Sequence, residues 1–101
     1  MSIITNPVWV RRPTGEDVEK ALPRRAIDEA VSGRATLICT VSTKGLMENC
    51  SIVSESPAGY GFGDAALSLT KLFAMAAMTR DGAPTAGGRA RIPLAFALPQ
   101  D

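Results

Sequence analysis

The chain has 101 residues, with eleven Lys and Arg against ten Asp and Glu, so we expect one domain that folds without a metal or a cofactor. The balanced charge argues against strong attraction to nucleic acid or to an anionic membrane surface. The longest unbroken apolar run, residues 72–78, is far below the ~20 residues that span a bilayer, so we expect no membrane insertion of this chain.

Residues 1–13 are expected to form an extended N-terminal lead, because the two prolines within them disfavour helix. Trp9 is the only tryptophan, and we expect it to anchor the lead on the domain. The alternative is a binding platform beside Arg11 and Arg12. The remaining residues, 14–101, form the domain itself.

Two short helices are predicted after the lead. Thr14 followed three residues later by Asp17 approximates a capping box, which opens a helix that runs to about Leu22. Pro23 is a favoured residue of a first helical turn and begins a second helix. This helix has an apolar stripe and is predicted to end at Gly33.

Residues 34–55 indicate a hairpin of two strands joined at Lys44-Gly45, because apolar and polar residues alternate in both halves. With a two-residue turn, and with both apolar faces on one core, three pairs lie opposite each other: Cys39 with Cys50, Val41 with Glu48, and Leu37 with Ile52. The cysteines would then be close enough for a disulfide. The other interpretation is two small buried hydrophobes that stay reduced.

A glycine-rich loop, residues 56–63, leads into a third helix, predicted from Gly63 or Asp64 to Ala76. Its apolar stripe is expected to cover the inward face of the hairpin. Phe73 and the neighbouring methionines are interpreted as core residues rather than as the lining of a ligand pocket.

Residues 88–98 show the clearest alternation of the chain and predict a strand. Pro93 cannot donate to a sheet ladder, so this strand is expected at a sheet edge with position 93 turned away from its neighbour. Arg91 and Ala95 would then also present their backbone groups outward. Such an edge either is protected against aggregation or serves as a dock for an incoming strand. The inward residues would be Ala90, Ile92, Leu94, Phe96 and Leu98.

The order of these elements predicts an α+β fold. We expect a two-layer sandwich, in which one three-stranded antiparallel sheet with strand order 2-1-3 carries its helices on a single face. The chain has no histidine, no Cys-x-x-Cys and no phosphate-cradling motif, so we expect no catalytic, metal-binding or cofactor-binding residues and no enzyme activity.

Short motifs follow one another along nearly the whole chain. They are Asn6-Pro7-x-Trp9, Arg11-Arg12-Pro13, Pro23-x-x-Ala26, Gly33-Arg34-Ala35-Thr36-Leu37, Cys39-x-Val41, Gly45-x-x-x-x-Cys50, Glu55-x-Pro57-x-Gly59-Tyr60-Gly61-Phe62-Gly63-x-Ala65-Ala66-Leu67, Asp81-Gly82 and Ile92-Pro93-Leu94-x-Phe96. In their order and spacing they resemble the C-terminal domain of TonB-like energy transducers. The family usually has tyrosine immediately before the proline at position 23, where this chain has Leu22.

The resemblance implies a periplasmic domain that grips a short peptide of a TonB-dependent outer-membrane receptor by strand addition. The chain would be a fragment of an inner-membrane-anchored transducer, and Cys39 and Cys50 would be joined in that oxidising compartment. If Met1 is the true start, the chain would instead be cytoplasmic and act as a stand-alone adaptor.

The peptide-binding residues are expected at the edge formed by the last strand and at the start of the second helix. Backbone groups would bind the peptide, and arginines would pair with acidic residues that flank it. The candidates are Leu22, Pro23, Arg24, Arg25, Arg89, Arg91, Pro93 and Ala95. A different function would be a structural module that self-associates as a homodimer by strand pairing.

Overall fold

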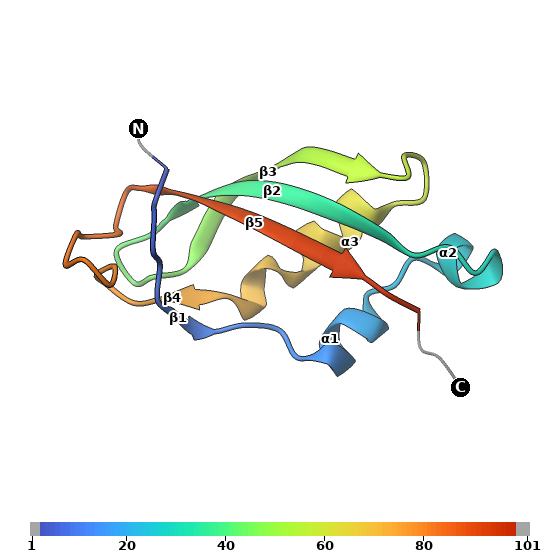
Figure 1. The fold of residues 1–101 in the computed structure, drawn as a ribbon, viewed down its shortest axis with the longest axis horizontal. Coiled ribbons are helices and arrows are strands. Elements are labelled where there is room, and N and C mark those ends of the chain that lie inside the picture. Colours follow the sequence, from blue (N-terminus) through green and yellow to red (C-terminus); the bar gives the residue numbers. More distant parts are fainter. Residues whose placement is uncertain (1–2, 99–101) are drawn as a thin grey trace.

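A three-stranded antiparallel sheet in the order β3-β2-β5 forms the centre of the structure. Its strands are β2 (Gly33–Val41), β3 (Met47–Ser56) and β5 (Arg89–Phe96), so the predicted order 2-1-3 is confirmed. The computed structural model describes residues 3–98. Figure 1 shows the helix α3 (Phe62–Leu69) running beneath this sheet, which gives the predicted two-layer α+β sandwich. No helix within residues 3–98 is long and apolar enough to cross a membrane.

The helices α1 (Gly15–Lys20) and α2 (Arg24–Asp28) occupy the predicted places. The capping box is confirmed: the backbone N–H of Asp17 donates to Thr14 Oγ1 at 3.1 Å, and the N–H of Thr14 donates to Asp17 Oδ2 at 2.9 Å. The second helix ends earlier than predicted, because Ala30 takes the left-handed conformation with φ 55° and the chain can no longer continue the helix.

The β2–β3 hairpin departs from the predicted register near its turn. Leu37 lies opposite Ile52 as predicted, but Val41 lies opposite Met47 and not Glu48. The turn is one residue longer than predicted, since the N–H of Ser42 donates to the carbonyl of Leu46 at 2.8 Å.

Two β-bulges in β3 then change the pairing. The first restores the predicted register, and the second shifts it by one residue. One places Asn49 and Cys50 together opposite Cys39, and the other inserts Val53 between paired neighbours. Asn49 has a φ of 50°, a value that asparagine adopts more readily than most residues. Each bulge adds one residue to β3 that has no partner in β2, which a strict alternation of faces does not predict.

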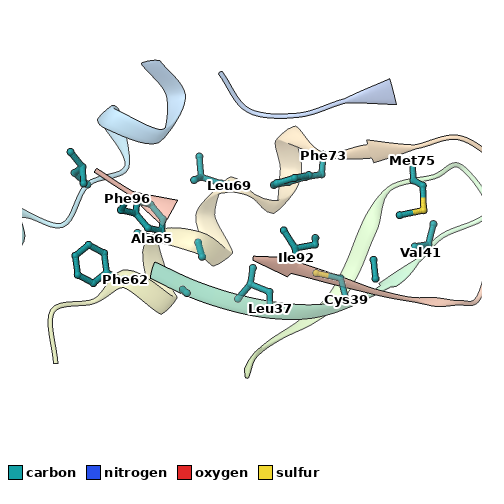
Figure 2. Packing of buried hydrophobic residues seen from close by; sticks show 14 of the residues in the cluster. Leu37, Cys39, Val41, Phe62, Ala65, Leu69, Phe73, Met75, Ile92 and Phe96 are labelled. Atoms are coloured by element: carbon teal, nitrogen blue, oxygen red, sulfur yellow. The ribbon is translucent and has the colours of Figure 1, made fainter. Parts of the chain in front are cut away.

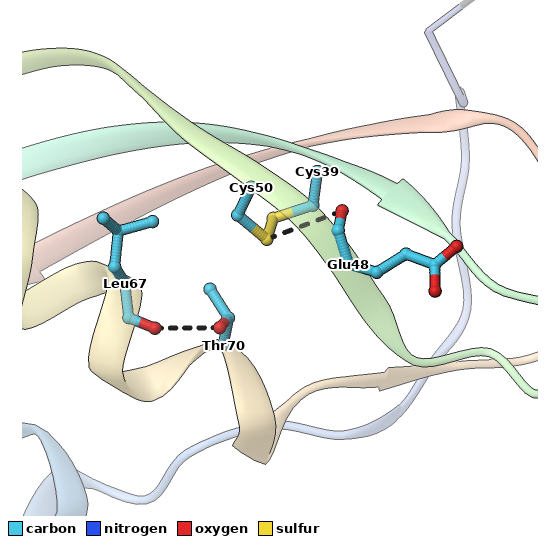
Figure 3. The surroundings of a disulfide bond; sticks show 5 residues. All are labelled: Cys39, Glu48, Cys50, Leu67 and Thr70. Atoms are coloured by element: carbon cyan, nitrogen blue, oxygen red, sulfur yellow. Dashed lines mark hydrogen bonds between the residues drawn. A yellow bond between two sulfur atoms is a disulfide. The ribbon is translucent and has the colours of Figure 1, made fainter.

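Cys39 and Cys50 form a disulfide, with Cα atoms 4.0 Å apart. The prediction that they face each other is therefore confirmed, and the interpretation as two reduced cysteines is wrong. Figure 3 shows the bridge beside the end of α3, near Leu67 and Thr70. Cys39 is fully buried, so the bridge ties the exposed strand β3 to the centre of the core.

The third helix is shorter than predicted. It ends at Leu69 and continues as the 3-10 turn η1 (Thr70–Leu72), and Phe73 is extended with ψ 137°. The next residues form a strand, β4 (Ala74–Met75), which pairs with β1 (Trp9–Arg11) of the N-terminal lead. This second sheet was not predicted, because the helical spacing of apolar residues continues through Phe73 and Ala76 although the backbone does not.

The core lies between the main sheet and α3 (Figure 2). β5 contributes as its alternation predicted: Ala90, Ile92 and Phe96 are buried, Leu94 and Leu98 are half-buried, and the residues between them are exposed. Phe73 and Met75 are buried in the same cluster, as predicted for core residues. The same prediction is wrong for Met78, which is 55% exposed. The other buried members include Leu37, Val41, Phe62, Ala66 and Leu69.

Candidate functional site

The outer edge of β5 is a regular row of backbone groups. β5 pairs with β2 without interruption from Phe96, opposite Gly33, to Arg89, opposite Thr40. Antiparallel pairs alternate between those that exchange hydrogen bonds and those that do not. Pro93 has no N–H, so its position must be one that turns away from β2.

Neighbouring hydrogen bonds follow the same alternation. Gly88 accepts from Val41 of β2 at 2.9 Å, whereas the carbonyl of Arg89 points the other way and accepts from the N–H of Ile4 at 2.8 Å. Arg91, Pro93 and Ala95 therefore point outward, as predicted, and we call these three positions the open edge. Arg91 and Ala95 each offer an N–H and a carbonyl, and Pro93 offers a carbonyl; none has a hydrogen-bond partner within residues 3–98.

A groove with a volume of about 410 Å³ lies along the open edge. Trp9 and Phe73 form part of its wall, packed edge to face with ring centroids 5.2 Å apart. The sheet of β1 and β4 brings these two rings together, because Trp9 lies opposite Met75. Trp9 thus anchors the lead and also lines the groove. The remaining lining residues are Arg12, Pro13, Val18, Arg91, Ile92, Pro93 and Leu94.

The charge around the groove is positive. Arg12 and Arg91 line it, and no carboxylate does. The ion pairs found within the described residues all lie on α1 and α2, and none involves Arg12, Arg89 or Arg91. These three arginines are exposed and remain available to an acidic ligand.

The predicted residues at the start of α2 are only partly brought to this edge. Leu22 is buried and lines an apolar hollow together with Ile27 and Leu98, which follows β5. Pro23 is the N-cap residue of α2. Arg24 pairs with Asp28 of its own helix at 3.4 Å. Leu22 therefore lies near the end of β5, whereas the Arg24 side chain is directed along α2.

Arg25 belongs to a separate cluster that holds α2 against the glycine-rich loop. Its Nε lies 2.8 Å from Glu29 Oε2, its Nη1 donates to the carbonyl of Gly59 at 3.2 Å, and its guanidinium lies 4.6 Å from the centre of the Tyr60 ring. The Tyr60 hydroxyl donates to Glu29 Oε1 at 2.8 Å. These contacts hold the exposed Arg25 side chain between α2 and the glycine-rich loop, and the structure does not bring it together with Arg89 and Arg91.

The hydrogen bonds of this cluster shift the pKa values of its members. The bonds from Arg25 and then from Tyr60 lower the pKa of Glu29, because both stabilise the carboxylate. The pKa of Tyr60 is raised, chiefly because its hydroxyl donates to Glu29 and secondly by burial. Both pKa shifts keep Glu29 ionised and Tyr60 protonated at neutral pH, which are the states that form these hydrogen bonds.

The opposite edge of the sheet, formed by β3, is irregular. The bulges at Asn49 and Val53 interrupt its pairing with β2 twice in ten residues. Bulges of this kind twist an edge and break the even spacing of its backbone groups. β5, in contrast, has no bulge along its eight residues, so it is the better template for another strand.

Sequence reasoning did not identify the groove. Val18 lies within the first predicted helix and Phe73 within the third, and the pairing of β1 with β4 that brings Trp9 to Phe73 is a contact between distant segments. Trp9 beside Arg11 and Arg12, an aromatic residue close to arginines in an extended segment, is the sequence signal that pointed toward this part of the surface.

The comparisons with known proteins agree on one family. A family model described as Gram-negative bacterial TonB protein C-terminal matches residues 18–98. The solution NMR structure of the Pseudomonas aeruginosa TonB CTD is similar in fold, with a TM-score of 0.64 and 14% sequence identity over 97% of this chain and 92% of that chain. No curated protein sequence matches.

Proposed function

Since the chain belongs to the family of Gram-negative bacterial TonB C-terminal domains, we propose that it is the periplasmic, receptor-binding domain of a TonB-like energy transducer. In this proposal a short peptide of an outer-membrane receptor adds as a fourth strand to the open edge at Arg91, Pro93 and Ala95. The observation that carries the proposal is the regular edge of β5, unpaired at Arg91, Pro93 and Ala95, with a groove beside it.

The difference between the two sheet edges supports this choice of strand. Strand addition needs backbone donors and acceptors at an even spacing, since main-chain hydrogen bonds supply the affinity. β5 offers that spacing and β3, with its two bulges, does not. Pro93 removes one donor from the open edge, so Arg91 and Ala95 would form most of the hydrogen bonds.

The groove supports a preference in the bound side chains. Successive side chains of a strand point to opposite faces of the sheet, so the peptide residues beside Ile92 and Leu94 would point into the groove, against Trp9, Val18 and Phe73. These positions should be apolar. The intervening peptide residues would lie on the exposed face of the sheet.

The arginines support a preference for acidic peptides. Arg91 lies on the exposed face and Arg12 at the groove, and neither has an acidic partner within the described residues. A carboxylate at a flanking position of the peptide would be attracted to both. Because these side chains are exposed, each pair would add about 0–1 kcal/mol and would act mainly on specificity and association rate.

The disulfide supports a periplasmic location. Cys39 and Cys50 are joined across the hairpin, and such structural bridges form and persist in oxidising compartments, of which the periplasm is one. The same compartment contains the receptor peptides that the proposal requires.

A second candidate function is self-association, because two copies could pair through the same open edge of β5. Light scattering over a range of protein concentrations distinguishes the two. A mass that stays at one chain supports the peptide binder, and a concentration-dependent rise to two chains supports the homodimer.

Amide chemical-shift mapping with a receptor-derived peptide tests the proposed function. We expect the largest shifts at residues 89–96 and at Trp9 and Val18 across the groove. Shifts that cluster on β3 or on the far side of α3, with residues 89–96 silent, would show that the edge is wrongly placed.

A further inference from the structure

The N-terminal lead already occupies one end of the β5 edge. Ile3 forms a parallel bridge with Arg89, and the N–H of Ile4 donates to the carbonyl of Arg89 at 2.8 Å. The Ile4 side chain also packs against Gly88, where an added Cβ would lie 2.8 Å from its Cγ1. Residues 3 and 4 thus act as the start of a fourth strand, supplied by the chain itself.

The lead leaves the edge again within two residues. Asn6 adopts the left-handed conformation with φ 53°, and its Nδ2 donates to Asp81 Oδ2 at 3.0 Å. Its carbonyl accepts from the N–H of Arg80 at 3.1 Å. These contacts hold the lead on the turn before β5, and the chain then continues away from the edge into β1.

We propose that residues 3–6 limit the length of the strand that can dock on β5, an inference that rests on the proposed function. Neighbouring strands lie about 4.7–4.9 Å apart, so the backbone of Ile4 fills the space in which a docked peptide would pair with Arg89. The peptide is thereby restricted to the positions opposite Arg91, Pro93 and Ala95. The site takes an extended peptide of about five residues, roughly 17 Å long.

This limit gives the lead a role in specificity. A longer receptor segment gains nothing from residues beyond Arg91 while Ile4 stays in place. Release of Ile4 frees the outward carbonyl of Arg89 for the peptide and extends the site toward the start of β5. The side chain of Arg89 is exposed with Ile4 in place, so it can attract an acidic flanking residue without backbone pairing.

Ile4→Pro tests the inference, because proline removes the N–H that donates to Arg89. Ile4→Val is the matched control, since it keeps the N–H and most of the apolar contact. The probes are an acetylated five-residue peptide of alternating valine and threonine with one glutamate, and the same peptide lengthened by Val-Thr at either end. Calorimetry gives Kd for each pair of protein and peptide.

With the unchanged chain and with Ile4→Val, we expect all three peptides to bind with Kd values within about twofold of one another. With Ile4→Pro, one of the two longer peptides should bind about fivefold more tightly, the effect of one added backbone hydrogen bond. The end at which lengthening helps also gives the direction of the docked strand. Equal gains from lengthening in the unchanged chain and in Ile4→Pro would overturn the inference.

Failure of the proposed function gives a different result, in which no peptide shifts the amides of residues 91–95 in any variant. Hydrogen exchange of the Ile4 amide in the free protein provides a readout that needs no peptide. We expect this amide to be protected by its bond to Arg89. Exchange at the rate of an unstructured chain would overturn the inference whatever the peptides do.

Discussion

Ala95→Pro is the sharpest test of the open edge, because it removes one outward N–H and leaves the bonds between β5 and β2 in place. Ala95 lies opposite Arg34 and is exposed, in the same orientation as Pro93, which the strand already accommodates. Proline is tolerated at an edge when its missing N–H faces away from the neighbouring strand. We therefore expect the fold to survive the change.

The expected loss of binding follows from the small number of outward donors. Arg91 and Ala95 supply the two N–H groups of the open edge, so Ala95→Pro leaves one. A backbone hydrogen bond contributes about 0.5–1.5 kcal/mol net, and Kd for a receptor-derived peptide should rise about 2- to 13-fold. Isothermal titration calorimetry measures this change directly.

Ala95→Val is the control, since it keeps the N–H and adds only an exposed side chain, and it should leave Kd nearly unchanged. Urea unfolding of both variants checks that the sheet is intact. If Ala95→Pro binds the peptide as tightly as Ala95→Val while both unfold at the midpoint of the unchanged chain, the peptide does not bond to this edge and the reasoning is refuted.

Three further changes test other parts of the structure. Replacing Cys39 and Cys50 by alanine opens a loop with a sequence separation of 11 and should cost roughly 3 kcal/mol of unfolding free energy in the chain-entropy model, measured by urea unfolding under oxidising conditions. Gly33→Ala would place a Cβ against the fully buried ring of Phe62, and we expect a loss of about 1–3 kcal/mol. Glu29→Gln should destabilise the chain at neutral pH, and the difference from the unchanged chain should disappear in acid. The pKa of Glu29 is lowered below its ordinary value of 4.5, so its stabilisation is present above that value and is lost as the pH falls through the folded-state pKa.

Each of these changes has its own control. The unchanged chain kept in reductant should match the double alanine variant, and a chain that loses nothing on reduction would contradict the first prediction. Gly15→Ala meets no atom within 4 Å and should be neutral or slightly stabilising, so equal losses at both glycines would contradict the second. A constant difference between Glu29→Gln and the unchanged chain from neutral pH to acid would contradict the third.

The last strand was predictable because two independent signals agree on it. The alternation from Ala90 to Phe96 predicts which side chains are buried, and Pro93 indicates which edge of the strand does not pair with β2. Both signals come from local chemistry. In this strand, burial and backbone chemistry favour the same structure. The facing cysteines were predicted from a two-residue turn. The turn is one residue longer, and the bulge at Asn49 brings Cys50 back opposite Cys39.

The bulges and the second sheet could not be predicted in the same way. An alternating pattern assumes that each residue of β3 pairs with one residue of β2. It therefore cannot predict the extra residues Asn49 and Val53. The end of α3 was misplaced because Phe73 has helical spacing but an extended backbone, and the pairing of β4 with β1 decides its conformation. That pairing joins segments more than sixty residues apart, and it also forms the wall of the groove.

The unequal edges of the sheet limit how many copies can join. Growth of a filament by strand pairing requires each added molecule to offer a second edge to the next one, and the bulged strand β3 lacks the even spacing for that step. Pairing of β5 with β5 is symmetric and closes after two copies. Such a pair would have both regular edges buried, so dimer formation and peptide binding at this edge would exclude each other, and strand pairing would stop at two copies.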